Sequence, residues 1–195
     1  VPLVADMSSD LLSRPLDVGQ FGLIYAGAQK NIGIAGVTIV IIDRDWMAKG
    51  NERLPKILQY RTHAEADSIF NTPPTYAIYV LGLALQWVEA QGGVAEMDRR
   101  AQAKSERIYE VLDRYPKIYR PHAEHACRSR MNAVFTLCDE AQTEDFVRAA
   151  AGAGFVGIQG HRRVGGLRIS LYNAVPREGV EKLADWMDDY AQRHR

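Results

Sequence analysis

Cysteine is scarce in this sequence, which has only Cys127 and Cys138 among its 195 residues. Two cysteines are too few for a disulfide framework, so we expect a reduced, cytoplasmic protein. An excess of one charge is also missing, because 24 Lys and Arg residues balance 24 Asp and Glu residues. That balance gives no electrostatic reason to expect nucleic acid or an anionic membrane as a partner. No apolar run approaches the roughly 20 residues of a membrane helix, so we expect no membrane span.

Recognised metal and nucleotide motifs are missing as well. Four potential metal ligands crowd into six positions: His122, Glu124, His125 and Cys127. Their spacing matches no known zinc pattern, so we expect no metal there and interpret the stretch as an exposed connection. A nucleotide-binding P-loop has Ser or Thr after its lysine, whereas Lys30 is followed by Asn31. This argues against a nucleotide phosphate loop.

Lys30 stands among small residues in the stretch 25–36, with an apolar run before it (21–26) and another after it (37–42). Glycine and alanine let the backbone approach a bulky group closely. We therefore expect this lysine to face a ligand rather than solvent. Burial near apolar groups favours the neutral amine, which is the form that attacks a carbonyl carbon.

Asp6 ends the apolar run 2–5 and lies 24 positions before Lys30. If the two runs are neighbouring parallel strands, both residues emerge at the carboxyl ends, where open α/β sheets bind ligands. The stretch between them is long enough for a parallel crossover. A lysine and a carboxylate meeting there are what pyridoxal phosphate requires. A solvated loop lysine and a turn aspartate are the alternative, which spacing alone leaves open.

Five segments carry a resemblance to a known family: residues 5–9, 13–15, 25–31, 160–162 and 165–174. They resemble the phosphoserine aminotransferase family, whose members are class V, fold-type I pyridoxal phosphate enzymes. The resemblance implies an α/β fold: part of the mainly parallel, cofactor-binding large domain, followed by a C-terminal α/β small domain. Family members have a long portion before the matching aspartate, so we interpret the chain as the C-terminal half of such an enzyme.

The resemblance also assigns cofactor-binding residues. Lys30 is the catalytic lysine, which holds pyridoxal phosphate as a Schiff base and moves the proton at the substrate Cα. Asp6 keeps the pyridine nitrogen protonated, and Gln29 contacts the cofactor phosphate. Asn71 and Thr72 reach the phosphate of the neighbouring subunit, which implies a homodimer with shared active sites.

The candidate substrate-binding residues lie in the second half of the chain. Arg168 lies inside a strand candidate and is either an edge residue or a buried fork for a carboxylate. His161 and Arg162 lie in a glycine-rich loop, where cations fit a phosphate or simply form a solvated turn. In the family, the arginine matching Arg168 binds the substrate α-carboxylate, and the residues matching His161 and Arg162 bind its phosphate. We place Arg163 outside the site.

The implied reaction is a transamination. O-phospho-L-serine and 2-oxoglutarate stand on one side of it, and 3-phosphohydroxypyruvate and L-glutamate stand on the other. It belongs to serine biosynthesis, and pyridoxine biosynthesis is a second pathway open to the family. Two alternatives remain: a non-catalytic half that only dimerises, and another fold-type I aminotransferase or desulfurase. One departure from the family pattern is Ile34, where proline is usual.

We expect a domain division after residue 91, with the large-domain part at 1–91 and a linking helix with the small domain at 92–195. In the first part we predict a buried strand at 37–42, a surface connection at 43–53 and a loop at 63–75. Apolar residues at helical spacing then predict a helix packed on the core: Tyr76, Tyr79, Val80, Leu83, Ala84 and Trp87.

In the second part, a long helix is expected over 94–112 and a strand over 131–137. Thr143 is expected to cap a helix that ends near Ala151, and a further strand is expected over 167–172. Pro176 opens the last helix, which has one apolar stripe: Val180, Leu183, Ala184, Met187, Tyr190 and Ala191.

Overall fold

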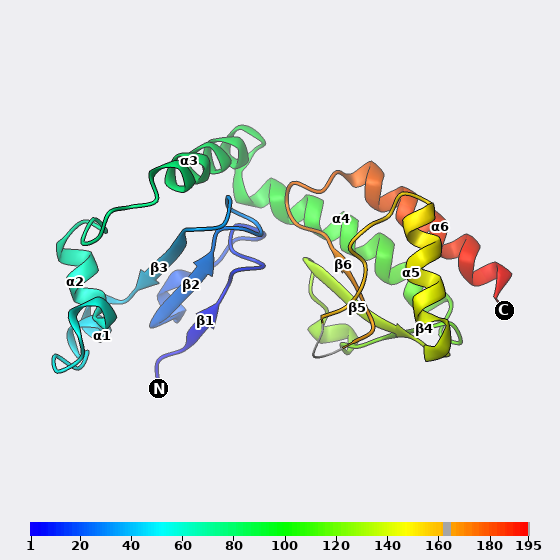
Figure 1. Cartoon of the computed structure of the whole chain (residues 1–195), viewed down its shortest axis with the longest axis horizontal. Helices are drawn as coiled ribbons and strands as arrows, with labels where there is room; N and C mark the ends of the chain where they lie inside the picture. The colour runs from blue at the N-terminus through cyan, green and yellow to red at the C-terminus, as the bar shows by residue number, and fades with distance from the viewer. Residues whose placement is uncertain (162–164, 195) are drawn as a thin grey trace. The chain divides into compact units, whose positions relative to one another are not determined.

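The computed structural model describes residues 1–161 and 165–194. The chain divides into two compact units, Val1–Ala95 and Glu96–Arg195, which Figure 1 traces in order along the chain. The long helix α4 (Gly93–Arg114) runs across this division. The sequence-based domain boundary after residue 91 stays a prediction.

The first unit contains a three-stranded sheet in the order β1-β2-β3, formed by Val4–Asp6, Leu23–Gly27 and Thr38–Ile42. Strands β1 and β2 are parallel, and Asp6 pairs with Tyr25 in their register. This confirms the predicted parallel pair. Strand β3 runs antiparallel to β2, so the sheet of this unit is mixed, whereas the sequence led us to expect a mainly parallel sheet for the large domain.

The crossover between β1 and β2 is made of turns and the short 3₁₀ helix η1 (Val18–Gln20). It carries Met7 and Leu11 into a cluster of buried side chains with Ile24 and Ile32. This cluster lies directly beside the ends of β1 and β2, so the strand ends that carry Asp6 and lead to Lys30 rest on a packed apolar base.

Strand β3 is less buried than its composition suggested. Val40 and Ile41 are both exposed, so the prediction of a fully buried strand at 37–42 is wrong for this chain. These two residues are consecutive and therefore point to opposite faces of the sheet, so neither face of β3 is fully covered within this chain. A run of β-branched residues predicts the strand conformation but not what covers it.

The helices of the first unit follow β3: α1 (Arg44–Ala48), η2 (Lys56–Leu58), α2 (Tyr60–Glu65) and α3 (Thr75–Ala90). Helix α1 occupies part of the expected connection, because the Asp43 carboxylate accepts a hydrogen bond from the Trp46 amide (2.7 Å) and caps it. Helix α2 takes the first three residues of the loop expected at 63–75.

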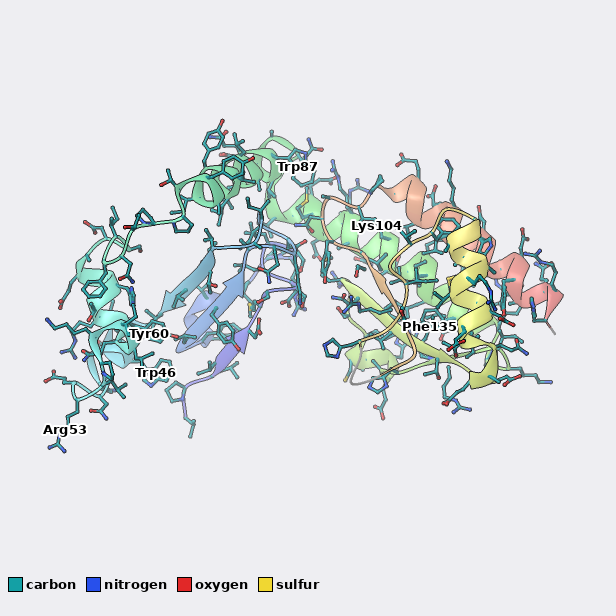
Figure 2. The ribbon with its side chains drawn as sticks, in the orientation of Figure 1. Trp46, Arg53, Tyr60, Trp87, Lys104 and Phe135 are labelled. Carbon is teal, nitrogen blue, oxygen red and sulfur yellow. The ribbon has the colours of Figure 1, made fainter. Side chains whose placement is uncertain are left out.

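The apolar stripe of α3 does not form the core that we predicted. Tyr76 is 72% exposed and Tyr79 62% exposed, and Trp87, which Figure 2 labels, is also exposed. The buried positions of the helix are Ala77 and Val88. Leu81 packs against the buried cluster of this unit, and Gly33 lies so close to the helix that an added Cβ would be 3.3 Å from the Leu81 Cα.

The second unit packs helices on an antiparallel sheet in the order β4-β5-β6. Its elements after α4 are β4 (Tyr119–Pro121), η3 (His125–Cys127), β5 (Asn132–Leu137), η4 (Glu140–Gln142), α5 (Thr143–Gly152), β6 (Leu167–Ser170) and α6 (Arg177–Arg193). The predicted strand at 131–137 and all three predicted helices of this part are confirmed, and the strand predicted at 167–172 is present but ends at Ser170. Strand β4 was missed, and Thr143 begins α5 rather than capping it, because the capping position is Gln142.

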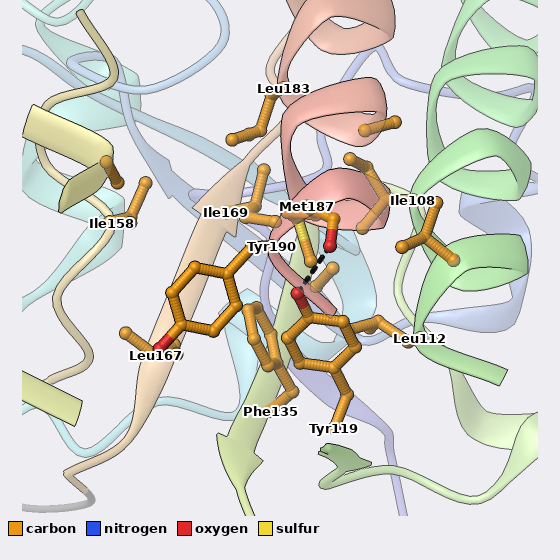
Figure 3. Close-up of a cluster of buried hydrophobic side chains, with 14 of the residues drawn as sticks. Ile108, Leu112, Tyr119, Phe135, Ile158, Leu167, Ile169, Leu183, Met187 and Tyr190 are labelled. Atoms are coloured by element: carbon orange, nitrogen blue, oxygen red, sulfur yellow. Dashed lines mark hydrogen bonds between the residues drawn. The ribbon is translucent and has the colours of Figure 1, made fainter. Parts of the chain in front are cut away.

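The core of this unit is aromatic and aliphatic (Figure 3). Tyr119 and Phe135 are fully buried and meet edge to face with ring centroids 5.6 Å apart. The Tyr119 hydroxyl donates a hydrogen bond to the Met187 carbonyl on α6 at 2.7 Å, and burial raises the pKa of this tyrosine. The stripe of α6 is buried at every predicted position, from Val180 to Ala191.

Lys104 on α4, labelled in Figure 2, is the one buried lysine among the described residues, with 2% exposure. Its ammonium donates to the carbonyls of Tyr172 (2.7 Å) and Val175 (3.0 Å), in the loop between β6 and α6. Burial, and secondarily the charge of Arg100, lowers the pKa of Lys104 from its ordinary 10.5 to about 8. Lys104 therefore ties α4 to the loop that follows the strand of Arg168.

We predict a specific pH dependence from Lys104. Between pH 8 and 10.5 the unfolded chain binds more protons at this residue than the folded chain, so its contribution to stability grows as pH rises and is lost as pH falls through 8. The unfolding free energy of the wild type should therefore increase with pH relative to Lys104→Met. Denaturant titrations at several pH values measure this difference.

The exposed Lys182 on α6 provides the control. Lys182→Met should keep a constant stability difference from the wild type over the same pH range. A constant difference for Lys104→Met as well would contradict the lowered pKa that burial gives Lys104.

Candidate functional site

Asp6 is the last residue of β1, and a serine two positions later holds its carboxylate. Asp6 Oδ1 accepts hydrogen bonds from the Ser8 hydroxyl (2.6 Å) and from the Ser8 amide (2.9 Å). These bonds are the main cause of a lowered Asp6 pKa, and the nearby Tyr25 side chain and Lys30 charge lower the pKa further. Asp6 is therefore a carboxylate prepared to accept a hydrogen bond from a cationic group.

Lys30 lies in a turn that begins directly after β2. The turn is anchored by the Ala28 amide, which donates to the Val37 carbonyl (2.9 Å), and by the Asn31 side chain, which donates to the Leu11 carbonyl (3.0 Å). Ala28 and Ile32 are buried. Lys30 itself is exposed, and the small residues around it fix the turn. The expectation that this lysine faces a ligand stays a prediction.

Gln29 lies over the end of β2. A Cβ added to Gly27 would be 2.7 Å from Gln29 Oε1, so the amide group of this side chain lies close against the backbone at the strand end. Asp6, Gln29 and Lys30 thus belong to two adjacent strand ends, as the sequence predicted. Ser8 and Tyr25, which also contact or influence Asp6, were given no role from sequence, although Ser two positions after Asp is a common turn signal.

Asn71 and Thr72 are exposed residues of the segment between α2 and α3, in the same unit as Lys30. The contact expected of them is with the cofactor of a neighbouring subunit, so it stays a prediction. The expected connection around His122 is indeed exposed. Within residues 1–161 and 165–194, no group of three His, Cys, Asp or Glu side chains is arranged to hold a metal ion.

Arg168 lies on β6 in the second unit. Its backbone amide donates to the Ile158 carbonyl (2.8 Å), and its side chain is half-buried. The guanidinium Nε is buried and has no hydrogen-bond partner among the described residues. A buried donor without a partner is costly, so this position suits a residue that binds a carboxylate better than it suits a solvated edge residue.

His161 is exposed at one end of a tight loop. The Gly165 amide donates to the His161 carbonyl (2.8 Å), and the Gly160 amide donates to the Gly166 carbonyl (2.9 Å). The loop is so tight that a Cβ on Gly160 would be 2.0 Å from the Gly165 carbonyl oxygen. Arg162 and Arg163 lie outside the described residues.

Comparison with known proteins gives a consistent result. The family model described as aminotransferase class-V matches residues 1–183. A phosphoserine aminotransferase of Geobacillus kaustophilus is 55% identical over 193 residues, covering 99% of this chain and 54% of the relative. One of Bacillus subtilis is 50% identical over 194 residues, covering 100% of this chain and 54% of the relative. The chain thus spans about half the length of these relatives.

Solved structures agree. Phosphoserine aminotransferase from Bacillus circulans subsp. alkalophilus superposes with a TM-score of 0.94 at 45% identity, covering 100% of this chain and 54% of that one. A pyridoxal phosphate-bound phosphoserine aminotransferase from Trichomonas vaginalis superposes with a TM-score of 0.89 at 36% identity, covering 95% of this chain and 53% of that one. These likenesses confirm the family resemblance and the fold class expected from sequence. Within the described residues, no helix is both long and apolar enough to cross a bilayer.

We predict that Gly160→Ala opens the loop of His161. The added methyl group would collide with backbone rather than with a flexible side chain, and such overpacking costs about 1–3 kcal/mol. The unfolding free energy should fall accordingly, and hydrogen exchange at the Gly160 and Gly165 amides should accelerate.

Gly152→Ala at the end of α5 is the matched control, because a Cβ there meets nothing within 4 Å. It should leave stability unchanged or slightly raised. Equal stability and equal amide exchange in the two variants would show that the loop is not closed as described.

Proposed function

Because the chain belongs to the class-V aminotransferase family, we propose that it is the lysine-bearing part of a pyridoxal phosphate-dependent phosphoserine aminotransferase. One observation carries the proposal: Asp6 ends a strand parallel and adjacent to the strand that leads into the Lys30 turn. The carboxyl ends of parallel strands are where α/β folds bind ligands.

The donor set fits the cofactor. A pyridinium nitrogen needs an ionised carboxylate, and hydrogen bonds from Ser8 keep Asp6 in that form. A carbonyl-reactive lysine must be reachable, and Lys30 is exposed at the same edge of the sheet. When bound, pyridoxal phosphate supplies a ring that accepts electrons from the substrate Cα.

Each candidate cofactor-binding residue has a distinct role in this proposal. Lys30 attaches the cofactor and afterwards carries the proton to and from the substrate Cα. Asp6 keeps the ring nitrogen protonated. Gln29 binds the cofactor phosphate, together with Asn71 and Thr72 of a second subunit.

The second unit orients the substrate. Arg168 binds its α-carboxylate, and the buried Nε without a partner supports that role. His161 and Arg162 bind its phosphate, which makes O-phospho-L-serine with 2-oxoglutarate the substrate pair and 3-phosphohydroxypyruvate with L-glutamate the products. The enzyme would serve serine biosynthesis, with the pyridoxine pathway as a second use, as a homodimer in the cytoplasm.

One observation favours a second candidate function. The exposed apolar residues of α3, among them Tyr76, Tyr79 and Trp87, are typical of a surface that is covered by another polypeptide. A non-catalytic half that only dimerises would keep this surface and lose turnover. A third candidate, another fold-type I aminotransferase or desulfurase, would keep turnover and lose the preference for a phosphorylated substrate.

The proposal predicts turnover that depends on both Lys30 and the substrate phosphate. The chain is mixed with pyridoxal phosphate, 2-oxoglutarate and either O-phospho-L-serine or L-serine, and glutamate formation is measured. We expect glutamate with phosphoserine only, and none with Lys30→Ala, because its methyl group cannot hold the cofactor. Lys49→Ala, at an exposed lysine of the same unit, is the control and should retain activity.

The other outcomes separate the rivals. Equal rates with serine and phosphoserine would favour another aminotransferase. A dimer in light scattering that forms no glutamate would favour the non-catalytic half. Full activity in Lys30→Ala would overturn the assignment of the lysine.

A further inference from the structure

We propose that Ser8 is a positioning residue for the reaction, acting through Asp6; this inference rests on the proposed function. Its hydroxyl joins the Asp6 carboxylate to the end of β2 and so fixes how Asp6 meets the cofactor ring. The residue touches neither substrate nor the reacting atoms in this account.

The direction of each hydrogen bond follows from chemistry. The Gly27 amide can only donate, and it donates to Ser8 Oγ at 2.9 Å. The single hydroxyl proton of Ser8 is therefore free to go to Asp6 Oδ1, 2.6 Å away. Accepting from an amide makes a hydroxyl a stronger donor. One side chain thus links β1, β2 and the carboxylate in one chain of bonds.

The hydrogen bond from the Gly27 amide to Ser8 Oγ replaces a backbone hydrogen bond that is missing from the β1–β2 ladder. The Met7 amide continues the parallel ladder by donating to the Tyr25 carbonyl (2.8 Å). The next rung of a parallel ladder would run from the Gly27 amide to the Met7 carbonyl. That carbonyl has turned away and accepts instead from the Leu11 amide (2.9 Å) as the crossover begins. The Ser8 hydroxyl takes its place.

A simple turn would not need this arrangement. Asp followed by Ser two positions later often forms a local hydrogen-bonded turn, and the Ser8 amide alone provides that bond here. The hydroxyl adds a contact to Gly27, nineteen residues away. Both Ser8 donors take Oδ1, so Ser8 leaves Oδ2 for another donor, which the proposed cofactor would supply through its ring nitrogen.

Two other groups face Asp6, both from β2 or the turn after it. Tyr25 is its register partner, and the Tyr25 side chain and the Lys30 ammonium each lower the Asp6 pKa by less than the Ser8 hydroxyl does. They remain when Ser8 is changed. The effect of a Ser8 variant on Asp6 can therefore be distinguished from the effect of its other neighbours.

The test compares Ser8→Ala with Ser8→Thr, which keeps the hydroxyl, and with Ser9→Ala as the matched control. The first measurement is a carbon-13 NMR titration of the Asp6 carboxyl in the cofactor-free chain, assigned with Asp6→Asn. We expect the pKa of Asp6 to rise in Ser8→Ala, to return toward the wild-type value in Ser8→Thr and to stay unchanged in Ser9→Ala.

The second measurement is the affinity of each variant for pyridoxal phosphate, followed by absorbance over a range of pH. Losing one hydrogen bond to a charged group should weaken binding roughly tenfold in Ser8→Ala, with recovery in Ser8→Thr. A merely structural role would lower stability without moving the Asp6 pKa or the pH profile of binding.

Each outcome supports or overturns the proposal. An unchanged Asp6 pKa, an unchanged affinity in Ser8→Ala, or failure of Ser8→Thr to restore both would overturn the positioning role while leaving the proposed function intact. Absence of pyridoxal phosphate binding by the wild type would overturn the proposed function and the positioning role together, even if the titration showed the Ser8 to Asp6 bond.

Discussion

The parallel pairing of β1 with β2 is the interaction on which the candidate site depends. It places Asp6 beside Tyr25 and lets the chain leave β2 into the Lys30 turn at the same edge. The packing of Met7, Leu11, Ile24 and Ile32 below the strands holds this pairing in register. A slip of one residue would turn Asp6 to the other face of the sheet and separate it from the lysine.

The second unit is built differently from the first. Its sheet is antiparallel and its core is closed by aromatic rings and by α6, so β6 is a rigid support for Arg168. The two ends of the His161 loop are joined by backbone hydrogen bonds, and a Cβ on Gly160 or Gly166 would collide with backbone. Arg168 and His161 thus have defined backbone positions, which the proposed binding of a small anionic substrate requires.

The spacing of apolar residues predicted an element correctly wherever this chain itself buries the apolar side chains of that element. The stripe of α6 and the strands at β5 and β6 follow directly from periodicity, and the pairing of β1 with β2 follows from the crossover length. The same reasoning failed for β3 and for the stripe of α3. Apolar side chains there are exposed, because periodicity predicts which face is apolar but not whether this chain covers it. The role of Ser8 could not be predicted either, since it depends on a contact between residues nineteen positions apart.

The most direct test of the account is to find which lysine captures the cofactor. The chain is incubated with pyridoxal phosphate, reduced with borohydride and digested, and the pyridoxyl peptide is identified by mass. The account predicts an adduct confined to Lys30, since among the described lysines it is the one whose charge lowers the pKa of Asp6. No adduct, or one scattered over exposed lysines such as Lys49 and Lys182, would contradict the claim that β1 and β2 build a cofactor site.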